Sequence, residues 1–341
     1  MDRKRYHYID VAKALGIFSI YLGHFAHAAG LAYHFVFAFH VPLFFFVSGC
    51  TDTLSREKSA LLRIKRRIGT ILVPYFFFAI SGLVFYALEI NASSDAMSDQ
   101  LRFALQGAVR NTFIVNQLWF LTCLFTTCVL FEVVRLLRYR WLIMPACVII
   151  HVVAQTMLPN NPTVAPSWYY NVDSAVYYLV FYAAGYAAFP AIAKFLDRCE
   201  GGKMVPNLIL GVLGLCALFY GLQVYDQKNP LEMWSAAPGY LELYPTIQAF
   251  ILIWLTVTIG YYLRNYTQLQ EIGKASLYLC GSEMFIRDML NQVLGTVGLS
   301  WAPATPLASV LCTLILLYLA WKLLCPIEIR CVQKIRSVLR V

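Results

Sequence analysis

Residues 9–29 read IDVAKALGIFSIYLGHFAHAA, an apolar run of membrane length that contains Lys13 and His24. These two residues are eleven positions apart, which on an α-helix is a rotation of about 1100°, or three turns plus about 20°. They therefore share one helix face, with a rise of about 16 Å between them in a hydrocarbon core of about 30 Å. Ionisable groups at such depth are costly, so we interpret the pair as functional.

The whole chain has the composition of a membrane protein. Of its 341 residues 60% are hydrophobic and 13% are charged, which excludes a soluble globular protein. We predict an all-α integral membrane protein, a polytopic bundle of about ten transmembrane helices that forms a single domain over residues 1–341. The predicted spans are residues 9–29, 35–51, 70–90, 118–137, 141–158, 174–190, 205–225, 243–263, 272–292 and 304–325.

The net charge of +9 orients the chain and does not indicate a nucleic-acid partner. With the N-terminus placed in the cytoplasm, 22 Lys and Arg residues fall on the cytoplasmic side and 3 on the other. This asymmetry follows the positive-inside rule and predicts that both termini are cytoplasmic. The ten cysteines show no Cys-x-x-Cys pair and no Cys/His ligand spacing, so we expect no metal site.

Two histidines lie in line with an ion pair in the first predicted span. Asp10, Lys13, His24 and His27 fall on or near one stripe of the helix. The charged pair could be interfacial anchors, and the histidines could bond to neighbouring helices. The combination favours a functional role instead, because neutral imidazole is suited to take a proton at neutral pH.

The second predicted span contains FHVPLFFFVSG at residues 39–49. Pro42 removes a backbone donor, and Ser48 and Gly49 loosen the helix end, so we expect this span to be kinked or broken. His40 lies just before the expected kink. It is a candidate catalytic residue, although a single histidine in such a place more often has a structural role.

Three later features carry polar chemistry. The basic run at residues 63–67, RIKRR, obeys the positive-inside rule, and its arginine forks also match phosphate oxygens. Trp119 opens the fourth span as an interfacial anchor or a substrate contact. In the ninth span Glu283 and Arg287 are four residues apart on one face. Glu283 is there either for helix packing or to orient a catalytic base.

Together these segments resemble the membrane acyltransferase-3 family of integral-membrane O-acyltransferases, which modify bacterial surface glycans and related molecules. The run from Tyr8 to His24 is similar to the family signature of a basic residue, ten further residues and a histidine. Residues 40–49 resemble its second-span motif, the arginines before Pro74 and Tyr75 its third-span motif, and LWFL at 118–121 its tryptophan motif.

The resemblance implies acyl transfer from a cytoplasmic acyl-CoA, most often acetyl-CoA, to a hydroxyl of a carbohydrate. By this analogy His24 is the catalytic base or a transient acyl carrier, and Lys13 supports the donor or the charge of the site. Arg63, Arg66 and Arg67 would contact the phosphates of coenzyme A. Acyl-CoA is a co-substrate, so no bound cofactor is expected.

The third-span arginines align with the family pattern in two ways. Counted back from Pro74, Arg67 matches one position of the usual pair and Thr70 the other. Arg63 and Arg66 have the right spacing but lie further from the proline. Which pair applies stays open.

Two other positions depart from the family pattern. Lys13 stands where arginine is common, and Glu283 stands where many members carry histidine. We still predict catalytic roles for His40 and Glu283 beside His24. Asp10 and Trp119 are the candidate substrate-binding residues.

Two functions are compatible with these features. The first is an O-acetyltransferase that crosses the inner (cytoplasmic) membrane several times and modifies a cell-surface carbohydrate or its lipid-linked precursor. The second is a proton-coupled transporter or flippase for a glycan or small solute, with the histidines and Glu283 as a proton relay. The expected partners are acyl-CoA, a hydroxyl acceptor and the lipid bilayer.

Overall fold

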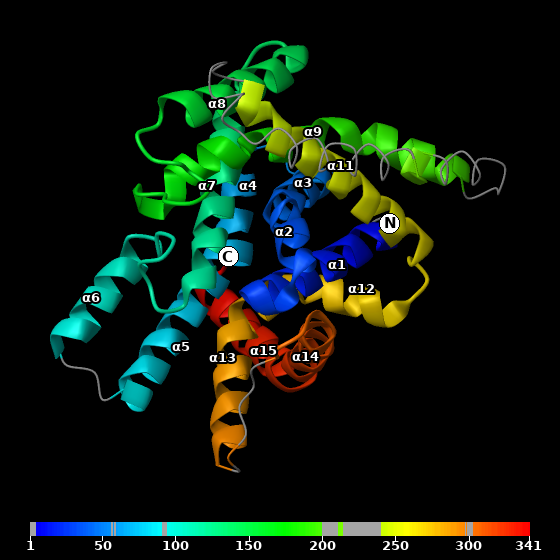
Figure 1. Ribbon diagram of the computed structural model, residues 1–341. Helices are drawn as coiled ribbons and strands as arrows, with labels where there is room; N and C mark the ends of the chain where they lie inside the picture. The colour runs from blue at the N-terminus through cyan, green and yellow to red at the C-terminus, as the bar shows by residue number, and fades with distance from the viewer. Residues whose placement is uncertain are drawn as a thin grey trace. The chain divides into compact units, whose positions relative to one another are not determined.

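The computed structural model describes residues 5–55, 57, 59–90, 94–199, 211–213, 240–296, 298 and 303–341. Over these ranges every regular element is helical and no strand occurs, which confirms the all-α class. The α-helices are α1 His7–Gly23, α2 Leu31–Phe37, α3 His40–Thr53, α4 Ala60–Arg67, α5 Val73–Ile90, α6 Ser94–Leu105, α7 Trp119–Val134, α8 Ile143–Met157, α9 Val172–Cys199, α11 Tyr240–Tyr262, α12 Thr267–Lys274, α13 Ser276–Gly295, α14 Pro306–Leu319 and α15 Cys325–Leu339 (Figure 1). The 3₁₀ segments are η1 Ala26–Ala29, η3 Asn116–Leu118, η4 Arg140–Leu142 and η5 Tyr169–Asn171, and the π segments are η2 Ile68–Leu72 and η7 Ala320–Leu324.

Seven helical stretches among the described residues are long and apolar enough to cross a membrane. They are Leu31–Thr53, Ala60–Leu88, Asn116–Val134, Arg140–Met157, Tyr169–Cys199, Pro245–Tyr262 and Pro306–Leu339, and each overlaps one predicted span. Predicted spans 9–29 and 272–292 are helical but not among the seven, because α1 is short and α13 carries three charged residues. Predicted span 205–225 lies outside the described residues except for 211–213. A total of ten stays a prediction.

Helix α1 is shorter than its predicted span, so the predicted end at residue 29 is wrong. The helix ends at Gly23, with His24 as its C-cap. Ala26 then adopts a φ of 49°, which a right-handed helix does not permit. The chain continues as η1 and turns at Gly30, whose φ is 58°.

The second span is broken as expected, but the break precedes His40, so its expected position at Pro42 is wrong. Residues 38 and 39 separate α2 from α3, and Pro42 lies in the first turn of α3, where a missing N–H costs little. The expectation that Gly49 loosens the helix end is wrong, since α3 continues past it. Gly49 instead permits close packing: a Cβ there would lie 2.0 Å from the Tyr182 carbonyl oxygen. A Cβ on Gly185 would likewise lie 1.9 Å from a carbonyl oxygen of α3.

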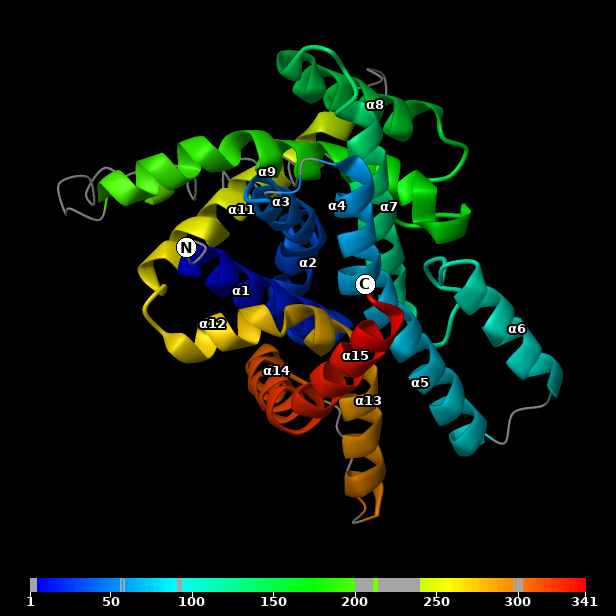
Figure 2. The same cartoon turned by 180° about the vertical axis from the view of Figure 1, so that it is seen from behind.

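The chain divides into two compact units, which are described separately. The first comprises Met1–Leu54 and Phe181–Ser276, and the second Ser55–Val180 and Leu277–Val341. In the first unit α1 packs against α11 and α12, and also against α2 and α3 (Figures 1 and 2). In the second unit α7 packs against α4 and α8, while α5 packs against α6 and α15.

Glycines bring the backbone of α1 close to that of its neighbours. A Cβ on Gly273 of α12 would lie 1.7 Å from the carbonyl oxygen of Asp10, and one on Gly260 of α11 would lie 2.6 Å from that of Tyr8. Small residues allow such approach between membrane helices, where lipid removes the hydrophobic driving force for association. Helix α1 is thus positioned by backbone packing.

Two helical stretches contain a π segment that ends two residues before a proline. In the second unit η2 precedes Pro74 and η7 precedes Pro326. Proline has no N–H, so the carbonyl four residues earlier loses its helical partner, and a wider turn accommodates the ring. The helical stretches Ala60–Leu88 and Pro306–Leu339 therefore continue through their prolines.

We expect Gly273→Ala to lower the free energy of unfolding by about 1–3 kcal/mol, because the added methyl group must displace the α1 backbone. Thermal unfolding of the purified protein in detergent measures this loss. Gly295→Ala is the matched control, since nothing lies within 4 Å of a Cβ at that position. Equal stability of the two variants would show that α12 yields to α1 at no cost.

Candidate functional site

Asp10 and Lys13 form a charged cluster near the beginning of α1. Asp10 is buried and accepts a hydrogen bond from Arg5 Nε at 2.7 Å. Its other oxygen lies 4.0 Å from Lys13 Nζ. The burial of this carboxylate is therefore compensated by two cations. The side chain of Lys13 is 24% exposed, so it is less buried than the carboxylate of Asp10.

His24 lies at the opposite end of α1. Its backbone N–H donates to the carbonyl oxygen of Ile20 at 3.1 Å, so one helical run joins it to Lys13, as the sequence predicts. The side chain of His24 is partly exposed. His27 is more exposed and lies in η1, where its ring centre is 6.0 Å from that of Tyr33. The two histidines thus differ in both burial and local structure.

His40 is buried at the first position of α3. Its Nδ1 lies 2.6 Å from the carbonyl oxygen of Val36, and because a carbonyl only accepts, Nδ1 carries the proton. In the neutral ring Nε2 is then the basic nitrogen. The Phe37 ring lies 4.9 Å from that of His40 and would be 2.9 Å from a Cβ on Gly23. One aromatic ring therefore contacts both His40 and the residue before His24.

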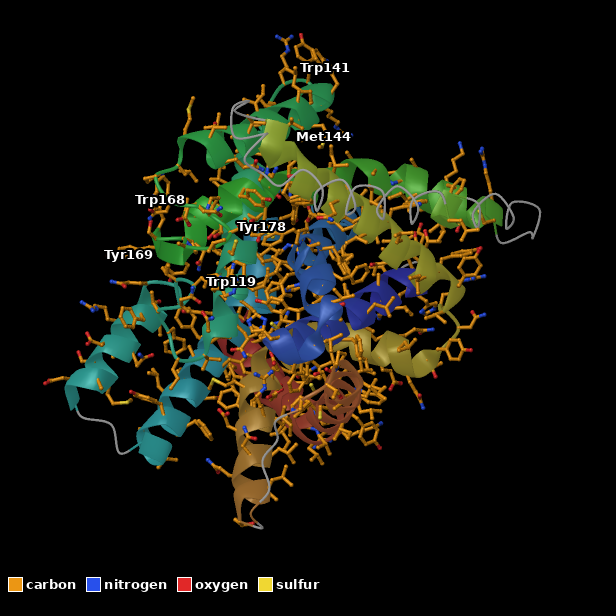
Figure 3. All side chains as sticks on the ribbon, viewed as in Figure 1. Trp119, Trp141, Met144, Trp168, Tyr169 and Tyr178 are labelled. Carbon is orange, nitrogen blue, oxygen red and sulfur yellow. The ribbon has the colours of Figure 1, made fainter. Side chains whose placement is uncertain are left out.

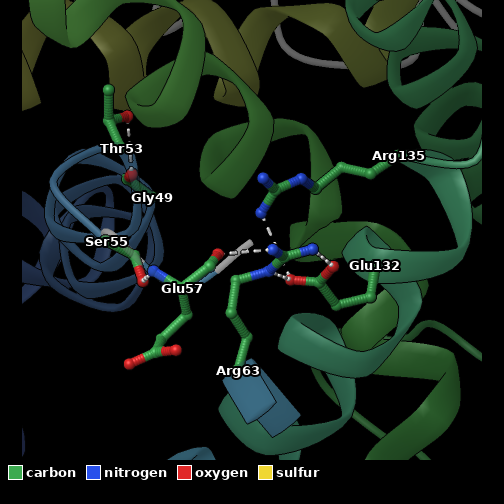
Figure 4. Close-up of polar contacts among 7 residues, drawn as sticks. All are labelled: Gly49, Thr53, Ser55, Glu57, Arg63, Glu132 and Arg135. Atoms are coloured by element: carbon green, nitrogen blue, oxygen red, sulfur yellow. Dashed lines mark hydrogen bonds and ion pairs between the residues drawn. The ribbon is translucent and has the colours of Figure 1, made fainter. Parts of the chain in front are cut away.

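Arg63 is buried in α4, and each of its three guanidinium nitrogens donates a hydrogen bond. Its Nε donates to Glu132 Oε1 of α7 at 2.6 Å, and Nη2 donates to the other oxygen of the same carboxylate. Its Nη1 donates to the backbone carbonyl of Glu57 at 2.7 Å. Arg135 approaches the same carboxylate at 3.2 Å (Figure 4). Two parallel bonds to one carboxylate are the strong and directional form of this pairing, so Arg63 fastens α4 to α7.

Arg66 and Arg67 follow on the same helix and are partly exposed. The helix then widens into η2, and Thr70 donates to the carbonyl oxygen of Arg66 at 2.9 Å. The arginine run therefore contains one buried residue that holds the helix and two more accessible ones that continue the basic surface.

Glu283 is fully buried in α13. The predicted pairing with Arg287 is confirmed, since Nη2 of Arg287 donates to Oε1 of Glu283. The side chain of Gln117 reaches the other oxygen at 3.4 Å. Both oxygens of this carboxylate are thus held by groups from α13 and from η3, two residues before Trp119.

Trp119 is the first residue of α7, and two side chains lie near its ring. The guanidinium carbon of Arg110 lies 4.9 Å from the ring centre, and the Tyr178 ring lies 6.4 Å away (Figure 3). The backbone is fixed as well: the buried side chain of Asn171 donates to the carbonyl oxygens of Trp119 and Gly107 at 3.4 and 3.2 Å. The indole is therefore held in one orientation.

A buried pair that the sequence analysis missed joins α13 to α15. Ser282 is adjacent to Glu283, and its hydroxyl lies 2.9 and 2.7 Å from the two oxygens of Glu328, which is buried. Glu328 falls beyond the predicted end of the last span at residue 325. The sequence does carry a sign of it: apolar residues continue on either side of this glutamate, as expected for a helix that extends beyond residue 325. The helical stretch runs to Leu339.

The predicted site residues divide between the two units. Asp10, Lys13, His24 and His40 belong to the first unit. The second unit holds the arginine run, Trp119 and Glu283. In the part of the chain that the structure describes, no group of three or more His, Cys, Asp or Glu side chains is placed to hold a metal ion.

Apolar membrane-length helices that bury charged groups define an integral membrane protein of several spans. The chain matches the acyltransferase domain over residues 6–324. It belongs to this acyltransferase-3 family, as the sequence motifs indicate, and is thus a membrane acyltransferase. Comparisons with curated proteins and with solved structures gave no match.

We expect Glu132→Gln to destabilise the protein by about 3–5 kcal/mol, because it removes the carboxylate charge that pairs with the buried Arg63 guanidinium. Glu57→Gln is the control: Arg63 binds the backbone carbonyl of Glu57, and the side chain of Glu57 is exposed. The loss of stability is measured by comparing the denaturation midpoints of the two variants in detergent. A Glu132→Gln protein as stable as the control would mean that the ion pair does not fasten α4.

Proposed function

We propose that this membrane acyltransferase is an O-acetyltransferase that uses acetyl-CoA and modifies a hydroxyl of a cell-surface carbohydrate or its lipid-linked precursor. The observation that carries the proposal is the family match over residues 6–324, which begins at the start of α1. That helix presents a partly exposed cation, Lys13, along its length and an imidazole, His24, at its far end.

In the proposed reaction His24 takes the proton of the acceptor hydroxyl. The hydroxyl oxygen forms an ester bond with the acetyl carbon, the thioester C–S bond breaks, and the proton passes to the thiolate of coenzyme A. A second route places the acetyl group on His24 first and transfers it to the acceptor afterwards. Both routes use an imidazole that can reach the reacting atoms, in keeping with the partial exposure of His24.

The donor phosphates lie against Arg66 and Arg67 in this proposal, because these arginines are partly exposed. Arg63 belongs to the same donor site but acts by holding α4 in place, since its fork binds Glu132. Lys13 adds positive charge on the donor side of α1.

The remaining candidates act on the acceptor and on proton transfer. His40 has its Nδ1 proton fixed by a backbone carbonyl, so Nε2 is the nitrogen that would take up a proton in a relay. Glu283 serves as an orienting carboxylate beside Arg287. Asp10 and Trp119 stay the proposed acceptor-binding residues.

The proposed membrane arrangement has ten spans in the inner membrane, with both termini in the cytoplasm. It is supported by the 22-to-3 division of Lys and Arg residues and by seven helices of sufficient length.

We expect green fluorescent protein fused to the C-terminus to fluoresce, and alkaline phosphatase fused after residue 111 to be active, because the first reporter works in the cytoplasm and the second outside it. The reciprocal fusions are the controls and should be silent. An active phosphatase at the C-terminus would reverse the proposed orientation.

We expect His24→Ala to lower acetyl transfer by about 10²–10⁴-fold, the usual contribution of a positioned general base. Purified protein, labelled acetyl-CoA and candidate glycans, scored by mass spectrometry, measure this loss. His27→Ala is the matched control, because this histidine lies three residues away and is exposed.

Normal acetylation by the His24→Ala protein, present at normal abundance, would remove His24 from the reaction. Movement of a glycan across vesicles containing the wild-type protein, without consumption of acetyl-CoA, would replace the transferase with a transporter.

A further inference from the structure

A pocket of about 540 Å³ lies in the first unit, where α1 begins and where α3 and α9 end. It is formed by Tyr6, the N-cap of α1, by Thr53 and Leu54 at the end of α3, and by one side of α9. Its size is within the range of pockets that hold small organic ligands. None of its residues is among the sequence-predicted site residues.

Aromatic rings form one wall of this pocket. The rings of Tyr6 and Phe189 meet edge to face, with centres 5.0 Å apart and planes at 85°. Phe189 is only 2% exposed, so its ring is held in place by the packing around it. Phe189 therefore packs behind the ring of Tyr6, which is partly exposed and is the aromatic surface that a planar ligand can reach.

Charged groups form the rim. Lys194, Asp197 and Arg198 line the pocket from the C-terminal part of α9, and Asp197 and Arg198 lie three and four residues after Lys194, on the side of the helix next to it. All three are exposed and therefore accessible to a ligand. The rim combines two cations, which suit phosphate, with one carboxylate, which accepts hydrogen bonds from hydroxyl or amino groups.

We propose that this pocket binds the adenosine end of the acyl-CoA donor, with the purine against Tyr6 and the ribose 3′-phosphate at Lys194 and Arg198; the diphosphate is the part of the donor assigned to Arg66 and Arg67. A phospholipid headgroup shares the phosphate but has no planar ring to occupy the aromatic wall. Asp197 would repel a second anionic headgroup, whereas it can accept from the ribose hydroxyl or the purine amino group.

The pocket lies at one end of α1 and His24 at the other. Eighteen residues separate Tyr6 from His24, which is about 27 Å along a helix. Coenzyme A carries its nucleotide and its thiol at opposite ends of a long chain. The inference rests on the proposed function in this respect: a donor anchored at Tyr6 would extend along α1, past Lys13, to present its thioester at His24.

The test is equilibrium binding of adenosine 3′,5′-bisphosphate to the purified protein, because this nucleotide lacks the acyl arm. We expect saturable binding that Lys194→Gln with Arg198→Gln weakens about tenfold or more, because the double variant removes both cations that would bind the phosphate. Lys274→Gln is the matched control: it removes an exposed cation of the same unit that does not line the pocket.

Unchanged nucleotide affinity in the double variant would overturn the proposal. So would weaker binding of a soluble short-chain phosphatidylglycerol by the double variant with nucleotide binding intact, because that result assigns the pocket to a lipid headgroup. Parallel kinetics separate this inference from the proposed function. In the double variant, a raised KM for acetyl-CoA at unchanged kcat supports the pocket. Acetyl transfer with an unaltered KM contradicts the pocket but not the proposed acetyltransferase activity. Nucleotide binding with no acetyl transfer by the wild-type protein would support the pocket and contradict the proposed acetyltransferase activity.

Discussion

A charge placed between apolar helices must be compensated within the protein, because lipid offers neither counter-ions nor hydrogen bonds. Arg63 meets this requirement through Glu132, and Glu283 meets it through Arg287. Asp10 does so with Arg5 and Lys13. Since breaking a buried pair is far more costly than breaking an exposed one, each pairing limits the positions that its helices can adopt. The few ionisable groups of this chain therefore contribute both to its packing and to its proposed chemistry.

Backbone packing supplies the rigidity that these pairs need. Gly273 and Gly260 bring two helices against α1, and Gly49 and Gly185 do the same for α3 and α9. A helix seated on a neighbouring backbone cannot rotate without a steric clash, so the side chains it carries keep their directions. This matters for a transferase, because a misplacement of about 1 Å can cost about 10²-fold in rate.

The sequence predicts the helical class and seven spans well, because long apolar runs have few other folds available to them. It also predicts the pairing of Glu283 with Arg287, which are close along one helix. It does not predict Arg63 with Glu132, which are 69 residues apart and meet only through packing of α4 on α7. The close contacts of Gly49, Gly185, Gly260 and Gly273 cannot be predicted from the sequence for the same reason, because each joins residues that are far apart along the chain. Catalytic roles for His24 and His40 depend on how each imidazole meets its substrates, which a single sequence does not encode locally.

The π segment η2 joins the basic helix α4 to the apolar helix α5 within one continuous helical stretch. A turn with one extra residue shifts all later side chains by about 100° relative to an unbroken α-helix. The arginines of α4 and the apolar side chains of α5 are therefore set in different rotational phases, although no loop separates them. The π segment before Pro74 thus lets the basic surface of α4 face one direction while α5 turns a different face to its neighbours.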